Sequence, residues 1–220
     1  MTKEWEQIIL EIKLDFIVDR SYIALVSNMK DTRSKIIEKG LYLMDLKGYN
    51  GTGLREIVEA AGIPKGSFYY YFESKEHFAI EAMKFYYEKK YKEANKILSD
   101  KNVSPFQRIQ DLFSYWIDED FSRAMFEKGC LLGNLAMEMS GVNREMGSIV
   151  DRDFKSLESL FKKCLIEAKE ANELKPSSDV EKLAEFIWNS WEGAILRMKA
   201  SKSSRPLKIF QDILHKIILN

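Results

Sequence analysis

Apolar residues recur every three to four positions along most of the chain, which is the spacing of helices with one buried face. The segment that begins at Asp31 shows the pattern well, with apolar residues at Ile36, Ile37, Leu41, Met44 and Leu46. Alternation of apolar and polar residues, which would indicate a strand, is absent. The chain of 220 residues is therefore expected to be all-α, with about ten helices and short connections.

Glycine, proline and capping residues divide this pattern into elements. Gly48 and Gly51 close the helix after Asp31, a short helix from Leu54 ends at Gly62, and a second short helix runs from Pro64 to near Phe72. Ser74 is expected to cap the following helix. The remaining helices are predicted at 76–99, 105–126, 127–141, 144–172, 179–200 and 206–219.

The stretch GIPKGSFYYYFESKE, residues 62–76, places three tyrosines between two phenylalanines. Phe68 and Phe72 are four residues apart, so they share one helix face and can pack inward. Their burial turns Tyr69 outward and leaves Tyr70 and Tyr71 on the flanks. An exposed aromatic cluster of this kind suggests a partner, although an aromatic core is the simpler alternative.

The residues around these tyrosines suit a phosphate backbone. Lys65 and Ser67 lie at a helix N-terminus, where free amides and the helix dipole favour an anion. Gly66 has no side chain to obstruct a close approach, and Lys75 offers a second cation. Tyrosine hydroxyls can donate to phosphates, and tyrosine rings can pack on sugars and thymine methyl groups.

Residues 31–77 resemble the DNA-binding head of the tetracycline-repressor (TetR) family of bacterial regulators. The resemblance rests on the run GYNGTGLREIVEAAGIPKGSFYYYFESKEHF. It implies that DNA contacts come from Arg55, Lys65, Gly66, Ser67, Tyr69, Tyr70, Tyr71 and Lys75. The chain departs from the family pattern at Pro64 and Tyr71. It also has Gly53 where a hydroxyl residue usually caps the first helix of the pair, so we expect Thr52 to cap that helix one residue earlier.

The resemblance also implies a division of the chain. Residues 29–77 form a helix-turn-helix DNA-binding domain, and residues 78–220 form a helical ligand-binding and dimerisation domain. Residues 1–28 are an N-terminal extension, which we predict to be helical from its apolar spacing, and Met29 is an alternative natural first residue.

Two heads about 34 Å apart can read successive major grooves, so a homodimer is expected. The two helices predicted at 144–172 and 179–200 carry broad apolar faces, and the resemblance implies that they pair with their copies in a four-helix bundle. The alternative is an ordinary monomer core. The expected interface residues are Phe154, Leu157, Phe161, Cys164, Ile187, Trp191 and Ala194.

The middle of the body is rich in aromatic residues and methionine, as ligand pockets are. The resemblance favours a cavity for the set, whereas for any one of these side chains a place in an ordinary core is the simpler interpretation. The run GCLLGNLAMEMS, residues 129–140, is expected to line the cavity. The expected pocket residues are Phe85, Phe113, Trp116, Met125, Cys130, Asn134, Met137, Glu138, Trp188 and Glu192.

Composition narrows the classes of function that remain. The 34 basic and 34 acidic residues balance, which favours a site-specific binder over a protein that coats nucleic acid. The chain has neither a metal-binding Cys/His spacing nor a known catalytic motif, and no cofactor or enzymatic activity is expected. Long apolar runs are also absent, so a cytoplasmic protein without a membrane partner is expected.

The sequence therefore predicts a ligand-responsive DNA-binding regulator. The expected partners are double-stranded operator DNA, a small and largely apolar effector, and a second copy of the chain. Repression, released by the effector, is the family's usual mode. A helical protein-interaction module without sequence-specific DNA binding is the alternative, and it would leave Lys65, Tyr69 and Lys75 without a role.

Overall fold

The computed structural model describes residues 29 and 31–219, and its regular structure there is entirely helical. After a helix over residues 31–47 come α2 (Leu54–Ala61), α3 (Lys65–Tyr71) and α4 (Lys75–Leu98). The later helices are α5 (Pro105–Trp116), α6 (Leu131–Met139), α7 (Arg144–Glu170), α8 (Val180–Ser201) and α9 (Arg205–Leu219). The all-α prediction is confirmed, while the predicted helical extension over 1–28 lies outside the described residues.

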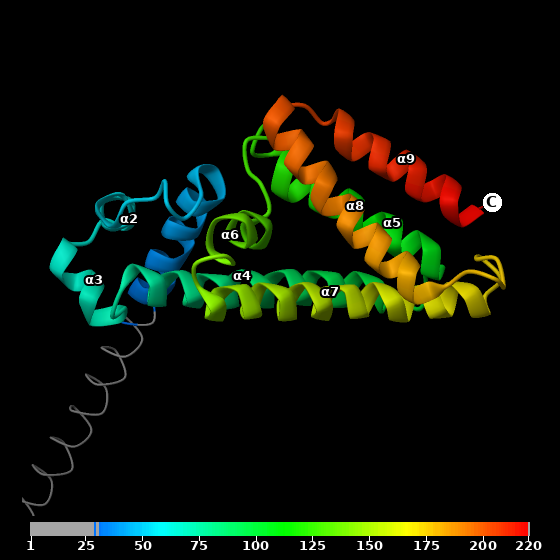
Figure 1. Ribbon diagram of the computed structural model, residues 1–220, viewed down its shortest axis with the longest axis horizontal. Helices are drawn as coiled ribbons and strands as arrows, with labels where there is room; N and C mark the ends of the chain where they lie inside the picture. Colours follow the sequence, from blue (N-terminus) through cyan, green and yellow to red (C-terminus); the bar gives the residue numbers. More distant parts are fainter. Residues whose placement is uncertain (1–28, 30, 220) are drawn as a thin grey trace, which may run out of the picture.

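The N-terminal helices form a small head at one end of the molecule (Figure 1). Its core contains Ile57, Phe68, Phe72 and Phe78, all fully buried. Gly62 ends α2 with φ 68°, a left-handed conformation that favours glycine. Together these features set α2 and α3 as a helix-turn-helix pair.

The helix N-caps in the head agree only partly with those predicted from the sequence. Ser74 caps α4 as predicted, because its Oγ accepts the amide of His77 at 3.0 Å. The prediction for Thr52 is wrong: it is fully buried, and its hydroxyl donates to the carbonyl of Gly48 at 2.7 Å. Gly53 is the N-cap of α2, and its amide donates to the Glu56 carboxylate at 3.0 Å.

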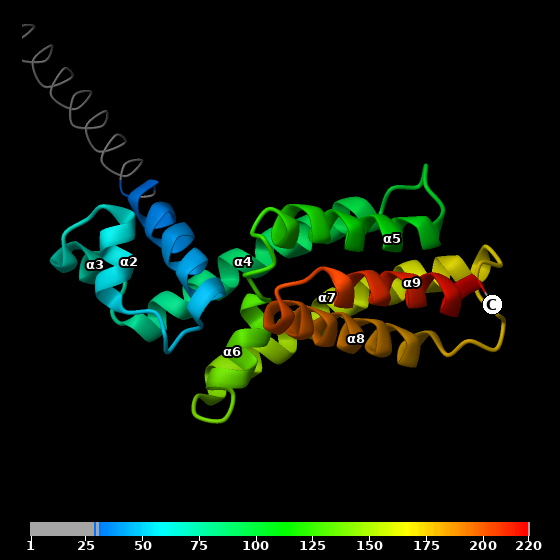
Figure 2. The ribbon, with the colours of Figure 1, turned by 90° about the horizontal axis from the view of Figure 1, so that it is seen from above.

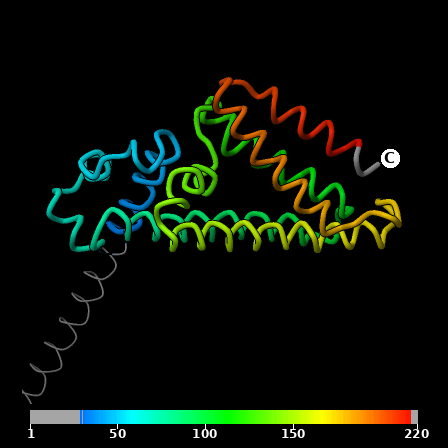
Figure 3. The backbone as a smooth tube through the Cα atoms, viewed as in Figure 1, coloured from blue at the N-terminus to red at the C-terminus, as the bar shows by residue number. Residues whose placement is uncertain are grey.

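The body is built on α4 and α7, which pack side by side along the long axis (Figure 1). The chain passes from head to body through α4, as the tube in Figure 3 shows. Helices α5 and α8 pack on α7, and α9 lies along α8 (Figure 2). The core between them is aromatic, with the rings of Phe113 and Phe161 stacked at a centroid distance of 5.2 Å.

The chain between α5 and α6 differs from the prediction. The predicted helices 105–126 and 127–141 are wrong at their junction, because α5 ends at Trp116 and a π-helical turn, Ile117–Ser122, follows it. The amide of Phe126 then donates to the carbonyl of Phe121 at 2.9 Å, and Phe126 has φ 58°. The wider turn carries Asp120, which forms an ion pair with the buried ammonium of Lys90 on α4. That contact spans 30 residues, so local periodicity could not indicate it.

Among the described helices, none combines the length and the apolarity that crossing a membrane requires.

Candidate functional site

Helix α3 divides its aromatic residues between the core and the surface. Phe68 and Phe72 are fully buried, whereas Tyr69 is 55% and Tyr70 is 67% exposed, as the pattern predicted. Tyr71 is half-buried, and its ring meets that of Tyr70 edge to face with centroids 5.2 Å apart. The helix therefore presents tyrosine rings and hydroxyls to solvent on a rigid phenylalanine base.

The first turn of α3 is open. Lys65 and Gly66 are exposed, Ser67 is half-buried, and a Cβ added to Gly66 would meet no atom within 4 Å. Arg55 on α2 is also exposed, and its Nε donates to Glu59 at 2.6 Å. These residues form what we call the reading surface: Arg55, Lys65, Gly66, Ser67, Tyr69, Tyr70 and Tyr71.

Lys75 differs from the other predicted contact residues because it is already engaged. Its ammonium donates to the carbonyl of Tyr49 at 2.6 Å and lies 4.1 Å from the centre of the Tyr49 ring. Burial lowers its pKa, and the nearby Glu138 partly offsets this. Lys75 thus fixes the start of α4 against the turn that precedes α2.

A second candidate site is a cavity of about 280 Å³ bounded by α6, α7 and α8, here called the body cavity. Four predicted pocket residues line it: Cys130, Asn134, Met137 and Glu192. The sequence reasoning missed other lining residues, and it had assigned Phe154 to the dimer interface. These further residues include Phe154, Leu196 and Lys199, whereas Gly129 and Gly133 belong to the run 129–140 that was expected to line the cavity.

Glu192 is the chemically distinctive residue of the body cavity. Its Oε1 is buried without a hydrogen-bond partner, and burial raises the pKa of its carboxyl to about 7. Burial and the neighbouring Glu192 carboxyl hold the pKa of the Cys130 thiol well above its ordinary value. Gly133 makes room for the carboxyl, since a Cβ there would lie 2.7 Å from Glu192 Oε2.

Two other predicted pocket residues, Trp116 and Trp188, line a void of about 20 Å³ beside the same carboxyl. A void of this size has room for about one water molecule. These indoles therefore form a packed wall behind the body cavity.

Four predicted pocket residues lie elsewhere. Phe113 is fully buried in the aromatic core, and Phe85 borders a separate hollow beside the head. Met125 is 75% exposed, because the turn after the π-helical segment gives it φ 50° and directs it to solvent. Glu138 points away from the body cavity toward the head.

Glu138 and Lys199 join the body to the head. The Glu138 carboxylate accepts the amides of Tyr49 at 3.0 Å and of Asn50 at 2.8 Å. The Lys199 ammonium donates to the carbonyl of Asp45 at 3.0 Å. Both residues belong to helices that line the body cavity, so the wall of the cavity is connected to the helix-turn-helix unit by short polar contacts.

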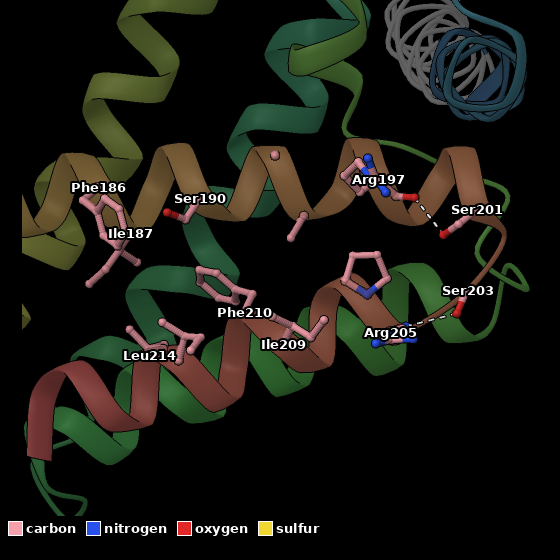
Figure 4. Close-up of a pocket in the computed structure, with 14 residues that line it drawn as sticks. Phe186, Ile187, Ser190, Arg197, Ser201, Ser203, Arg205, Ile209, Phe210 and Leu214 are labelled. Atoms are coloured by element: carbon pink, nitrogen blue, oxygen red, sulfur yellow. Dashed lines mark hydrogen bonds between the residues drawn. The ribbon is translucent and has the colours of Figure 1, made fainter.

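A larger hollow is a groove of about 670 Å³ between α8 and α9, here called the α8–α9 groove. Phe210 and Leu214 extend from α9 toward α8 and form its floor (Figure 4). Exposed apolar residues lie on its rim: Phe186 is 53%, Ile209 is 50% and Ile213 is 45% exposed. Arg197, Arg205 and three serines also line the groove. An exposed apolar surface of this kind is typical of a protein contact.

The structure places the interface residues predicted from the sequence in different settings within one protomer. Five of those side chains are at most 2% exposed inside one protomer, where they pack in its core, and Ile187 also lines the α8–α9 groove. These five are Leu157, Phe161, Cys164, Ile187 and Trp191. Phe154 lines the body cavity, and Ala194 lines the α8–α9 groove. The interface predicted from the sequence did not include the exposed apolar residues of α9, although their i, i+4 spacing gave the same apolar signal.

Two family models match the chain. The bacterial regulatory proteins of the tetR family match residues 36–82, and the tetracyclin repressor-like C-terminal domain matches residues 105–214. The HTH-type transcriptional repressor DhaR of Mycobacterium sp. (strain GP1) is 33% identical over 85% of this chain and 92% of its own length. The transcriptional regulator AcuR of Cereibacter sphaeroides is 33% identical over 80% of each chain.

Solved structures agree with these matches. The regulatory protein TetR from Rhodobacter sphaeroides superposes with a TM-score of 0.80 at 30% identity, over 84% of this chain and 97% of that one. The reduced form of E. coli NemR gives a TM-score of 0.77 at 29% identity, over 86% and 97%.

Proposed function

Because this chain belongs to the tetracycline-repressor (TetR) family, we propose that it is a cytoplasmic transcriptional repressor that leaves its operator when a small effector binds the body. The observation that carries this proposal is the exposed tyrosine surface of α3 on a buried phenylalanine base. Repression follows from the relatives DhaR and NemR, both of which are named as repressors. The protein-interaction alternative is not favoured.

The proposed reading domain spans residues 29–77 and uses the reading surface on double-stranded DNA. Tyr69 and Tyr70 are placed to contact phosphates and base edges, with Lys65 at the first turn of α3 beside a phosphate. Lys75 is assigned a positioning role, because its ammonium holds the Tyr49 carbonyl.

The body, residues 78–220, is proposed to form the homodimer through the α8–α9 groove. The groove carries exposed apolar side chains and lies between α8 and α9. Two copies that face each other there would cover Phe186, Ile209 and Ile213. Dimerisation would then set the spacing of two reading heads on successive major grooves.

The contacts of α6 and α8 support a route for the effector signal. Glu138 lies next in sequence to Met137, which lines the body cavity, and Lys199 lines it directly. A ligand that moves either helix would change the hydrogen bonds to Tyr49, Asn50 and Asp45. Only a ligand with different affinities for the DNA-bound and released states can shift the equilibrium between them.

The test is selection of a DNA site from random sequence, followed by fluorescence anisotropy at two salt concentrations. We expect tight and selective binding that weakens as salt rises, because phosphate contacts release counterions. A folded protein that selects no sequence would overturn the proposal and favour the interaction module.

A further inference from the structure

The body cavity is open on one side. Met137 on α6 and Leu196 on α8 both line it, and they are 75% and 54% exposed. Toward the core the lining is buried, because Cys130 is 8% exposed and also borders the void beside Trp188. The mouth of the cavity therefore lies between two exposed apolar side chains. A small apolar ligand held there would remain partly in water, whereas ligand sites usually bury most of the ligand surface.

The mouth of the cavity adjoins the α8–α9 groove. Gly193 on α8 lines both hollows, so the exposed ridge of this one helix separates them. Phe186 precedes Gly193 by seven residues and Leu196 follows it by three, which places all three on the same ridge. All three are exposed. A partner that covers Phe186 in the groove therefore has the mouth of the cavity directly beside it.

Gly193 indicates a close neighbour outside the protomer. Glycine in the interior of a helix is less favourable than alanine, so its presence there calls for a cause. The described part of the chain supplies none, because a Cβ added at Gly193 would meet no atom within 4 Å. Gly133 on α6 differs, since a Cβ there would lie 2.7 Å from Glu192 Oε2. A helix of a second chain could approach the backbone of α8 closely at Gly193.

We propose that a second copy of the chain crosses α8 at Gly193 and closes the body cavity, so that the partner subunit completes each effector site. This inference deepens the proposed function and rests on its dimer through the α8–α9 groove. A ligand in such a site contacts both chains. It therefore tightens the dimer as much as dimerisation tightens the ligand, because coupling between two binding events is reciprocal.

Thiol labelling with N-ethylmaleimide tests whether the partner covers the mouth. Leu196→Cys is compared in the dimer and in the monomer made by Ile209→Glu with Ile213→Glu. At a chain concentration about 100 times the Kd of the dimer, less than about a tenth of the chains are monomeric, so labelling of the dimer should be more than about tenfold slower. Peptide mass spectrometry separates this thiol from those of Cys130 and Cys164, which are 8% and 2% exposed.

Two further positions calibrate the labelling. Ile166→Cys lies on α7 at a site that is 41% exposed and lines neither hollow, so it should react equally fast in dimer and monomer. Phe186→Cys lies on the rim of the groove and reports the groove interface itself. It should be protected in the dimer as strongly as Leu196→Cys.

Gly193→Leu tests the close approach of the partner. The added Cβ meets no atom within the protomer, and leucine favours a helix more than glycine does, so the variant should fold. Its side chain should hold the two chains apart and raise the Kd of the dimer about tenfold or more, as measured by sedimentation. Gly141→Leu, at another glycine whose added Cβ would meet no atom within 4 Å, is the matched control and should keep the wild-type Kd.

The outcomes separate this inference from the dimer on which it rests. If the wild type is monomeric, or if Phe186→Cys reacts equally fast in dimer and monomer, the groove is not the interface and both proposals fail. If Phe186→Cys is protected while Leu196→Cys is not, the groove dimer stands and closure of the cavity is overturned. An unchanged Kd in a folded Gly193→Leu variant also overturns it.

Discussion

The reading surface and the α8–α9 groove are both exposed, but they differ in their polar atoms. Tyr69 and Tyr70 end in hydroxyls that water can satisfy whenever the partner is absent. Ile209 and Ile213 offer only hydrocarbon at similar exposure. A surface that water solvates suits a partner that binds and leaves, whereas an apolar rim favours one that stays. The comparison assigns DNA to the first surface and a second copy of the chain to the groove.

The largest effect is expected from charges in the groove. Ile209→Glu combined with Ile213→Glu should convert the dimer to a monomer, because two carboxylates would be buried in an apolar interface. Operator affinity should fall by a factor of about 100 to 10,000, since two linked heads bind far more tightly than one. Sedimentation measures the change from dimer to monomer, and fluorescence anisotropy measures the fall in operator affinity.

Ile166→Glu is the control for that experiment. Ile166 is 41% exposed on α7 and does not line the groove. The control should leave both mass and operator affinity unchanged. If the groove variant remains a dimer, the groove is not the interface.

A smaller effect is expected at the reading surface. Tyr69→Ala should weaken operator binding by about 10- to 100-fold through lost phosphate or base contacts, with the dimer intact. Tyr115→Ala, which removes a tyrosine that is 38% exposed on α5, should have no effect. Unchanged affinity in a folded Tyr69→Ala variant would remove α3 from the interface.

The contact between the head and the body can be weakened without touching either surface. Glu138→Ala removes the acceptor for the amides of Tyr49 and Asn50, so their hydrogen exchange should speed up by about tenfold. Mass spectrometry of peptides that cover this turn measures the change. Glu127→Ala, an exposed acid before α6, is the control. Equal exchange in both variants would show that Glu138 does not hold the turn.

The smallest effect is a pH dependence of stability that comes from Asp45, which lies on neither surface. Burial raises the pKa of this carboxyl from 3.8 to about 7. The folded chain therefore holds a proton that the unfolded chain has lost, and stability falls as pH rises toward and through 7. Between pH 6 and 8 the loss should be about 1 kcal/mol.

Asp45→Asn should remove this part of the pH dependence and keep operator binding. Urea unfolding at several pH values measures it. If the dependence on pH is the same in wild type and variant, Asp45 does not titrate in this range.

The head could be predicted from the sequence because its signals are local. The Gly62 turn, the Ser74 cap and the spacing of Phe68 and Phe72 all lie within a few residues of the structure they determine. The body could not be predicted as fully, because core and interface helices carry the same apolar period. Trp191 and Ile209 both fall on the apolar positions of a helical repeat, yet Trp191 is 2% exposed and Ile209 is 50% exposed.

Polar contacts between residues far apart in the sequence could not be predicted from local sequence patterns. Glu138 appeared to be a pocket residue because its helix lines the cavity, and only the fold brings it to a turn 88 residues away. The π-helical turn after Trp116 likewise carries Asp120, whose ion pair with Lys90 joins it to α4. Contacts of this kind are determined by packing and leave no periodic signal in the sequence.

The most direct test of the two-surface assignment is the molar mass of the chain by light scattering, measured with and without its selected operator. We expect twice the mass of one chain in the absence of DNA, and one such pair on each duplex. Without DNA, Tyr69→Ala should keep the mass of two chains. Ile209→Glu combined with Ile213→Glu should have the mass of one chain. A folded wild-type chain that is monomeric without DNA, or a Tyr69→Ala variant that loses the pair, would contradict the assignment.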